Sequence, residues 1–442
     1  MDPNTLALPL TGPQYGMWAG QHLDPDSPSF WTAEAIELTG PLDTPALEAA
    51  LRDTLSACDA LHMRYRLQGE EVVQILDAAR PVVIAHQDYS NCEDPWRSAR
   101  AWMDEDLQRS ADLAQRPLFA TALIRLGEHR HLWYLRAHHI ALDGFAYLLL
   151  IHRVAELYSA RVGGRAAAPA RDWSLAASIA DEAAYRASPR FLADRDYWTQ
   201  RFADVGEPVT LGPKRAPDDS SHSQRRLLAP AEYARWQTAA RGLGVDWATW
   251  LIASIFAWLH ARSGASDLSL GLLVMNRLGT PALAVPCMAM NVVPLRLRIG
   301  PEQSFEGLVR TVAGELRELR SHQRYNYEWM RRDLGLADGH AQLYGPVVNL
   351  MPFDRGFVFE GLHSRAHPIS VGSVEDLDIT VSPMAEGIRF DIEANPQAYD
   401  AATLQAHHAA LCEVLETVIA EPAISVDALA RRVSSPRTAE AA

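Results

Sequence analysis

Residues 136–145, Arg136-Ala-His-His-Ile-Ala-Leu-Asp-Gly-Phe145, are the most informative stretch of this 442-residue chain. The apolar run over 132–138 predicts a β-strand, and the apolar run over 145–157 predicts a helix. Side chains alternate along a strand, so His138 and His139 point in opposite directions if the strand continues through His139. One histidine can then face a cleft while its neighbour is packed inside.

An aspartate and a glycine complete the pattern HHxxxDG at the predicted strand-to-helix junction. Asp143 is a good helix N-cap, and backbone N–H groups at a helix start, including that of Gly144, can stabilise developing negative charge. Any one of these residues alone would be interpreted as an ordinary packed or capping residue. Their combination favours a catalytic site, whereas the second pair, His407-His408, lies within a predicted helix and has no Asp-Gly after it.

Both halves of the chain mix helical and strand patterns. Helices are predicted over 45–55, 145–157, 175–187, 191–202, 230–241, 247–262, 305–323 and 401–419, and strands over 118–126, 132–138, 268–274, 347–350, 378–382 and 388–394. The Gly-, Ala-, Pro- and Arg-rich stretch 162–172 predicts a linker. The chain is longer than one core usually serves, so we expect two α/β lobes, 1–180 and 181–431, and a flexible tail, 432–442.

Composition excludes several classes of function. The 55 Asp and Glu outnumber the 41 Lys and Arg, which argues against nonspecific binding to nucleic acid or to an anionic membrane. The most apolar run, 247–259, is shorter than the roughly 20 residues of a membrane span, and the N-terminus has no secretory signal. The 4 cysteines lie far apart, so neither disulfides nor a zinc site is expected, and no other metal or redox motif appears. We expect a cytoplasmic protein.

HHxxxDG is the signature of the condensation domains of nonribosomal peptide synthetases, which belong to the chloramphenicol-acetyltransferase-like superfamily. The chain resembles these domains from about Leu8 to Arg431, and its segment 8–18 resembles their opening motif. Residues 57–65 depart from the family pattern, because Ala-Cys-Asp stands in place of Arg-His-Glu at their start.

Further segments carry the resemblance into the second half of the chain. Residues 264–277 and 290–296 are similar to second-lobe elements that end at an arginine, here Arg277 and Arg296. Residues 343–354 and 372–377 are most similar to condensation enzymes of catechol-siderophore synthetases, of the enterobactin and vibriobactin kind. Siderophore or antibiotic biosynthesis, within secondary metabolism, is the implied setting.

The resemblance implies an α/β fold of two acetyltransferase-like lobes in a V-shaped pseudo-dimer with a central tunnel. It implies that His139 faces this tunnel, orients an amine and acts as general base, while His138 and Asp143 are structural. Asp143 is expected to pair with an arginine from the second lobe, with Arg277 as first candidate. The resemblance further implies Arg296 as the second candidate partner of Asp143, the Gly144 N–H as a hydrogen-bond donor to the thioester oxygen, and Asn349 as a residue that faces the tunnel. The alternative for each arginine is a solvated residue on the surface. The alternative for Asn349 is a side-chain amide that is hydrogen-bonded within the core.

The implied reaction joins an acyl group, carried on the phosphopantetheine of a carrier protein, to a free or carrier-bound amine through an amide bond. The enzyme is expected to be a monomer without a bound cofactor or metal, because phosphopantetheine comes with the carrier protein. The sequence has no adenylation signature and no carrier serine motif, so the donor is supplied by another protein or by a neighbouring module. An ester-forming O-acyltransferase, an epimerisation domain and a catalytically silent recruitment module are the alternatives. The presence of His139 disfavours the silent module, and the segments 8–18 and 343–354 favour condensation over epimerisation.

Overall fold

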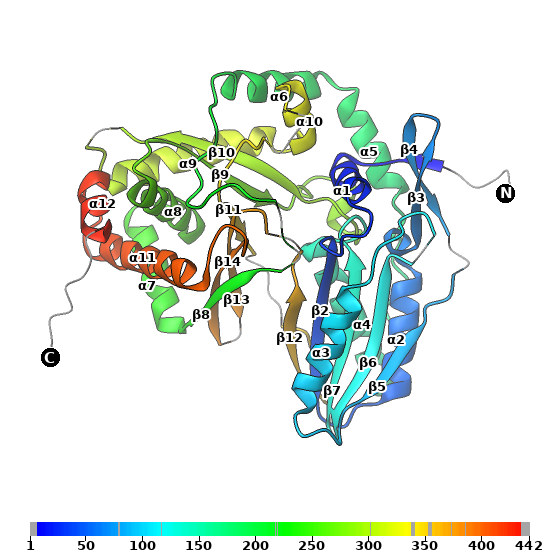
Figure 1. The fold of residues 1–442 in the computed structure, drawn as a ribbon. Coiled ribbons are helices and arrows are strands. Elements are labelled where there is room, and N and C mark those ends of the chain that lie inside the picture. The colour runs from blue at the N-terminus through cyan, green and yellow to red at the C-terminus, as the bar shows by residue number, and fades with distance from the viewer. Residues whose placement is uncertain are drawn as a thin grey trace, which may run out of the picture. The chain divides into compact units, whose positions relative to one another are not determined.

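The computed structural model describes residues 7–77, 80–115, 117–216, 218, 220–300, 302–336, 341–351, 356–372, 374–384 and 386–434. The chain divides into two compact units of mixed helices and strands (Figure 1). The first unit comprises Met1–Pro189, Met275–Met290 and Arg355–Gly372, and the second comprises Arg190–Val274, Asn291–Asp354 and Ser373–Ala442. The two return segments were not part of the first lobe predicted from the sequence. They join the first unit through a strand pairing and a buried ion pair that are described below.

The first unit is built on a five-stranded sheet with the order β12-β2-β7-β6-β5. Its strands are β2 (Trp31–Thr39), β5 (Ile84–Asp88), β6 (Phe119–Gly127), β7 (Arg130–His138) and β12 (His363–Ser370). Neighbouring strands are antiparallel except β5 and β6, which are parallel. The antiparallel pair β6 and β7 confirms the strands predicted over 118–126 and 132–138. β12 pairs with β2 and so adds a distant segment to the sheet edge.

Helix α3 (Pro95–Leu107) packs on one face of this sheet. Its Ala99 and Met103 belong to a buried cluster with Ala33 and Tyr134 of the strands. Helices α2 (Thr44–Ser56) and α4 (Gly144–Val162) pack against each other beside the same sheet (Figure 1). Both helices were predicted, although α4 is longer than 145–157, and residues 165–174, within and just after the predicted linker, have no regular secondary structure.

Several smaller elements of the first unit were not predicted. A helix, α1 (Gly12–Leu23), and a three-stranded sheet with the order β1-β4-β3 occupy its N-terminal part. The strands of this small sheet are β1 (Ala7–Pro9), β3 (Met63–Gln68) and β4 (Glu71–Leu76). Gln14 connects α1 to the small sheet, because its Nε2 lies 3.1 Å from both Tyr65 Oη and Gln74 Oε1. Helix α5 (Ala176–Arg186) confirms the helix predicted over 175–187.

The second unit contains a six-stranded sheet with the order β10-β9-β11-β13-β14-β8. Its strands are β8 (His222–Leu228), β9 (Asp267–Val274), β10 (Asn291–Arg298), β11 (Val347–Leu350), β13 (Leu377–Met384) and β14 (Gly387–Ala394). The helices of this unit are α6 (Pro189–Arg201, beginning at the last residue of the first unit), α7 (Pro230–Gly242), α8 (Trp247–Ser263), α9 (Phe305–His322), α10 (Tyr327–Asp333), α11 (Ala401–Ala420) and α12 (Val426–Ser434). β11 is parallel to both of its neighbours, β9 and β13.

Helix α8 is the central helix of the second core. Asp246 caps its start by accepting a hydrogen bond from the Thr249 N–H at 2.7 Å, and Gly264 ends it with a positive φ of 70°. Trp250 and Trp258 are fully buried in this core, whereas Trp247, the first residue of the helix, is half-buried. Among the described residues no single helix is long and apolar enough to span a membrane, although α7 and α8, bent by 91°, pass together on length and composition.

Helix α12 continues to Ser434, so the prediction of a flexible tail from residue 432 is wrong for residues 432–434. The helix persists there because Leu429 and Val433 are buried. Residues 435–442 of the predicted tail lie outside the described residues.

Candidate active site

His138 is the last residue of β7 and is fully buried. Its ring lies beside Phe30 and Trp31, with centroid distances of 5.8 Å and 5.4 Å. Its Nδ1 accepts a hydrogen bond from the Ile140 N–H at 3.1 Å, and its Nε2 lies 2.9 Å from Gln21 Oε1. Burial lowers the pKa of His138 to about 3, so the imidazole is neutral at physiological pH.

His139 follows the strand and lies in a turn. The premise that β7 continues through His139 is therefore wrong, and the turn, not strand alternation, gives the two rings different environments. The His139 N–H donates to Phe30 O at 2.8 Å, and the side chain is partly exposed although its Nδ1 is buried. Burial lowers the pKa of His139, and the opposing effects of the Asp143 charge and of the carbonyl groups of His139 and Leu142 do not cancel that shift. The ring is accordingly a neutral base near pH 7.

Gly372 lies beside His139 and was singled out from sequence only as part of a family-like segment. A Cβ atom at this position would lie 4.0 Å from His139 Cδ2 and 3.5 Å from Ser29 O, and its φ is +99°. A glycine is suited to this backbone conformation, and its missing side chain leaves the space beside the imidazole open. β12 delivers Gly372 there, held by the hydrogen bond from Ser370 Oγ to Trp31 O at 3.0 Å. The only sequence feature that could have indicated a role for Gly372 is the position of a glycine directly after a strand-like run.

Asp143 is the N-cap of α4 and fixes the end of the histidine loop. Its Oδ1 accepts from the Ala146 N–H at 2.9 Å. Its Oδ2 accepts from the N–H groups of Ala289 and Met290 at 3.1 Å and 3.0 Å. Arg277 Nη2 donates to both carboxylate oxygens, at 2.8 Å and 2.9 Å. The carboxylate therefore joins the loop, the helix start and the segment 275–290.

Arg277, the first candidate partner of Asp143, is confirmed as its partner. The guanidinium is fully buried and also donates to the carbonyl groups of Ala282, Val285 and Cys287. The negative charge of Asp143 raises the pKa of Arg277 even though burial acts in the opposite direction. Residues 275–290 belong to the first unit, so the pair lies within one unit and does not join two lobes as predicted.

Gly144 is the first residue of α4 and is exposed. N–H groups of the first helical turn lack partners within the helix, and Gly144 donates no hydrogen bond to another described residue. The positive end of the helix dipole therefore presents an available donor a few residues from His139. Four of the predicted residues, His138, His139, Asp143 and Gly144, thus lie in one loop that Arg277 secures.

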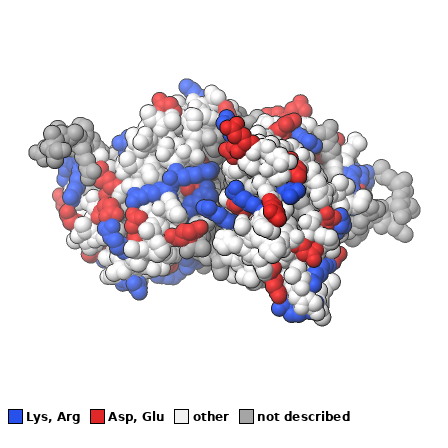
Figure 2. Space-filling model, turned by 90° about the horizontal axis from the view of Figure 1, so that it is seen from below, with Lys and Arg blue, Asp and Glu red and all other residues white. Residues whose placement is uncertain are grey.

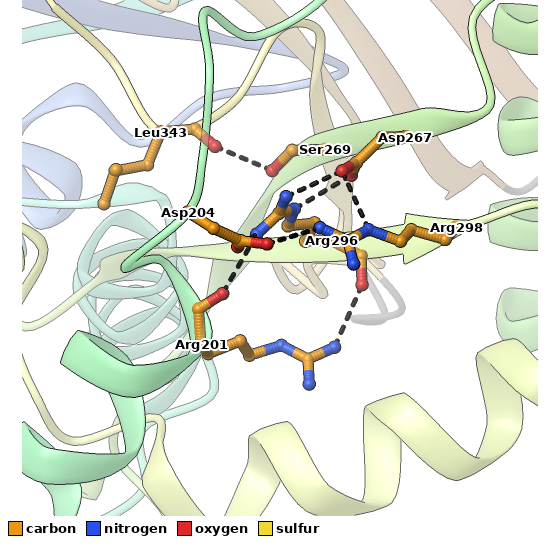
Figure 3. A network of polar contacts seen from close by, with 7 residues as sticks. All are labelled: Arg201, Asp204, Asp267, Ser269, Arg296, Arg298 and Leu343. Carbon is orange, nitrogen blue, oxygen red and sulfur yellow. Dashed lines mark hydrogen bonds and ion pairs between the residues drawn. The ribbon is translucent and has the colours of Figure 1, made fainter.

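Arg296, the second candidate partner of Asp143, is held elsewhere, in the second unit. β10 places it beside β9, where its guanidinium binds Asp267 through Nε at 2.8 Å and Nη2 at 2.6 Å. Its Nη1 binds Asp204 at 2.6 Å, and Arg298 contacts the same two carboxylates (Figure 3). Arg296 therefore supports the junction between α6 and the sheet, and its prediction as a partner of Asp143 is wrong.

Asn349 also belongs to the second unit, at the third position of β11. The neighbouring Val348 is buried in the core, so Asn349 points to the opposite face of the sheet, in register with Thr380. The side chain is partly exposed, which excludes the alternative of a fully buried core amide. A tunnel-facing role for Asn349 stays a prediction.

On the side of the molecule seen in Figure 2, basic and acidic side chains are interspersed, so that side does not carry charge of one sign alone. Within the described ranges, no three or more His, Cys, Asp or Glu side chains are grouped so that they could hold a metal ion. The contacts that hold the loop of His139 are hydrogen bonds, the Asp143–Arg277 ion pair and the start of α4.

Comparison with known proteins agrees with this geometry. The family model "Condensation domain" matches residues 5–433. The chain is 38% identical over 423 residues to a dimodular nonribosomal peptide synthase of Bacillus subtilis (strain 168), covering 95% of the chain and 18% of that protein. It is 39% identical to an isonitrile lipopeptide synthase of Streptomyces coeruleorubidus (97% and 29% covered) and 31% identical to enterobactin synthase component F of Escherichia coli (strain K12) (94% and 33% covered). The chain thus spans about a fifth to a third of the length of these relatives.

Solved structures give the same answer. The first condensation domain of the calcium-dependent antibiotic synthetase, in complex with substrate analogue 3a, has a TM-score of 0.87 at 34% identity, covering 96% of this chain and 98% of that one. A mutant starter condensation domain of rhizomide synthetase RzmA, in complex with C8-CoA and Leu-SNAC, has a TM-score of 0.88 at 31% identity, with 95% and 96% covered. The predicted α/β fold is confirmed by these matches, and the chain belongs to the condensation-domain family of nonribosomal peptide synthetases.

Proposed function

We propose that this chain forms an amide bond between an acyl group, held as a thioester on the phosphopantetheine of a carrier protein, and an amine acceptor. The amine nitrogen attacks the thioester carbonyl carbon, the C–N bond forms, and the C–S bond breaks. The proton lost by the amine passes to the departing sulfur, so that the products are an amide and a free thiol. No bound cofactor takes part, because the carrier protein supplies the phosphopantetheine.

His139 is the proposed base. Its lowered pKa keeps the ring neutral near pH 7, which lets it accept the amine proton as the tetrahedral intermediate forms or collapses. The Gly144 N–H, at the positive end of α4, is the proposed donor to the oxygen that carries negative charge in that intermediate. General-base catalysis typically contributes about 10²–10⁴-fold, and orientation of the two reactants can contribute as much.

One observation carries this proposal: a neutral, partly exposed imidazole lies just before an open helix start, in a loop that the buried Asp143–Arg277 pair holds. Asp143 and His138 are already fully engaged with protein groups, which leaves His139 as the residue of the motif able to act on a substrate. The structure of the related starter domain with C8-CoA and Leu-SNAC supports an acyl donor and an amine-bearing acceptor as the reactants.

The donor class is proposed from the relatives. The resemblance of residues 343–354 and 372–377 to catechol-siderophore enzymes favours an aryl acyl group, and the C8-CoA in the structure of the rhizomide starter domain favours a medium-chain fatty acyl group. The test supplies the protein with carrier proteins loaded with 2,3-dihydroxybenzoyl, octanoyl or aminoacyl groups, together with free or carrier-bound amines and alcohols. Mass spectrometry is expected to detect an amide from an aryl or octanoyl donor. An ester as the main product identifies an O-acyltransferase instead, and the absence of any product with every donor contradicts the proposal.

A further inference from the structure

We infer that Gln21 of α1 is a positioning residue for the condensation reaction, because it fixes the tautomer of His138 and, through it, the turn that carries His139. Gln21 lies 117 residues from His138 in the sequence and outside the HHxxxDG motif. This inference rests on the proposed function for its kinetic readout, but its first step is a proton position that can be measured without any substrate.

The orientation of the Gln21 amide is determined by its surroundings. The side chain is buried, and its Nε2 lies 2.8 Å from Asp24 O and 3.2 Å from the carbonyl oxygens of Pro25 and Ser27. Carbonyl oxygens only accept hydrogen bonds, so the NH₂ group must face them and Oε1 must face His138. The opposite orientation would place an oxygen against three oxygens.

The proton of His138 follows from this orientation. Gln21 Oε1 can only accept, so the 2.9 Å contact requires that His138 Nε2 carries a hydrogen. In a neutral imidazole Nδ1 is then an acceptor, and it receives the Ile140 N–H at 3.1 Å. The Ala141 N–H also donates to the His138 carbonyl, at 2.9 Å, so both contacts shape the turn that contains His139. The other tautomer would place two donors, His138 Nδ1–H and Ile140 N–H, against each other.

The residue before Gln21 supports the same loop from its other end. A Cβ atom at Gly20 would lie 2.5 Å from Phe30 Cζ, so the Phe30 ring occupies the space that a side chain would need. The Phe30 carbonyl accepts the His139 N–H at 2.8 Å. The last turn of α1 therefore contacts both histidines, His138 through a hydrogen bond and His139 through Phe30.

Two substitutions separate positioning from simple stability. Gln21→Met and Gln21→Glu both remove the donors to the carbonyl groups of residues 24–27, but Gln21→Glu keeps an acceptor for His138 Nε2–H. If Gln21 acts by fixing the tautomer, Gln21→Met lowers kcat about 10- to 100-fold, as expected for a displaced catalytic group, with little change in KM. Gln21→Glu then retains clearly more activity than Gln21→Met. If Gln21 acts only by holding residues 24–27 in place, Gln21→Glu is no more active than Gln21→Met, because its carboxylate cannot donate hydrogen bonds to the carbonyl oxygens of those residues.

The proton position itself is read by NMR of the histidine ring nitrogens. Burial lowers the pKa of His138 to about 3, so this ring stays neutral at pH 5.5, and its ring-nitrogen signals are assigned as those missing from a His138→Asn variant. We expect the ring hydrogen of His138 to lie on Nε2 in the parent and in Gln21→Glu. In Gln21→Met we expect the ring to adopt the Nδ1–H tautomer or to exchange between the two tautomers. Gln200→Met, an exposed glutamine on α6, is the control and keeps the parental spectrum and kcat.

The outcomes distinguish this inference from the proposed function. A parent protein that makes no amide contradicts the proposed function but leaves the tautomer measurement standing. A hydrogen on Nδ1 of His138 in the parent overturns the inference, and so does a folded Gln21→Met variant with parental kcat, even where amide formation by the parent is established.

Discussion

Asp143 and Arg277, 134 residues apart in the sequence, form an ion pair in which the two side chains are 2% and 0% exposed. The carboxylate also accepts the N–H groups of Ala146, Ala289 and Met290, so little of its hydrogen-bonding capacity is left for a substrate. A buried charge without its partner is strongly destabilising, whereas a paired and hydrogen-bonded one is tolerated. The pair therefore has a structural role, which is to hold the histidine loop in place.

Asp143→Ala is expected to lower stability and activity together. The variant leaves the Arg277 charge buried without its counter-ion and removes the cap of α4, which predicts a loss of about 3–5 kcal/mol in the free energy of unfolding. Urea unfolding and amide formation measure the two effects. The control is Asp246→Ala, which removes a cap from α8 without breaking an ion pair and should cost about 1 kcal/mol. Loss of activity with an unchanged free energy of unfolding would contradict the structural assignment.

Much of the fold followed from local patterns in the sequence. The apolar helix predicted over 247–262 is α8, Trp247–Ser263, and the strand predicted over 347–350 is β11. These segments have a strong hydrophobic period or a capping residue at their start, both of which are local properties. α1 was missed as a helix, because its glycines and proline weaken the helical pattern of residues 12–23.

The arrangement of the site depends on contacts that no local pattern contains. The pairing of β12 with β2 and the hydrogen bond between Gln21 and His138 join distant segments, so neither could be predicted from periodicity. The family resemblance offered two arginines as partners of Asp143. Only the three-dimensional structure identifies Arg277, because Arg296 lies on β10 beside Asp267. The different environments of the two histidines were expected, but from a strand that in fact ends at His138.

The rate of amide formation is expected to depend on pH through His139. Burial lowers the pKa of this imidazole below 6.5, and only the neutral form can accept a proton. The contribution of His139 to activity should therefore fall on acidification, with a midpoint below 6.5. The measurement is kcat/KM between pH 5 and 8, with circular dichroism at each pH to confirm that the protein stays folded. A midpoint above 6.5 would assign the titration to another group.

Gly20→Ala is expected to disturb the histidine loop from α1. The new Cβ would meet Phe30 Cζ at 2.5 Å, so the ring must move, and with it the carbonyl that accepts the His139 N–H. Overpacking of this kind costs about 1–3 kcal/mol, and a fall in kcat should accompany it. Gly314→Ala is the control, because it lies within α9 with no atom within 4 Å of its Cβ, and alanine favours a helix. Equal effects of the two substitutions would show that Phe30 adapts without moving the loop.

Arg296→Met is expected to destabilise the second unit more than Arg298→Met. The Arg296 side chain is 8% exposed and binds Asp204, Asp267 and the Arg201 carbonyl, whereas Arg298 is 64% exposed (Figure 3). We expect a loss of about 1–2 kcal/mol for Arg296→Met and a smaller loss for Arg298→Met in urea unfolding. The order of the two variants is the test, and a larger effect of Arg298→Met would be inconsistent with the burial of Arg296.

The same network gives a pH dependence with a defined sign. Hydrogen bonds from Arg296 and Arg298 lower the pKa of Asp204 to about 2, and hydrogen bonds from Arg296 also lower that of Asp267. Their contribution to stability is present above the unfolded pKa near 3.9 and is lost as the pH falls through the lowered folded values. The stability difference between the parent and Arg296→Met should therefore shrink between pH 4 and pH 2, which unfolding at a series of pH values measures.

The most direct test of the account is the rate of amide formation by His139→Ala in a single turnover with a loaded carrier protein and its amine. The expected rate is about 10²–10⁴-fold below that of the parent, with an unchanged free energy of unfolding, because the imidazole of a partly exposed residue is removed while the Asp143–Arg277 pair stays in place. His86→Ala, which removes an exposed histidine from the same unit, serves as the control and should react at the parental rate. Product formation by His139→Ala as fast as by the parent would contradict the role of His139 as the base.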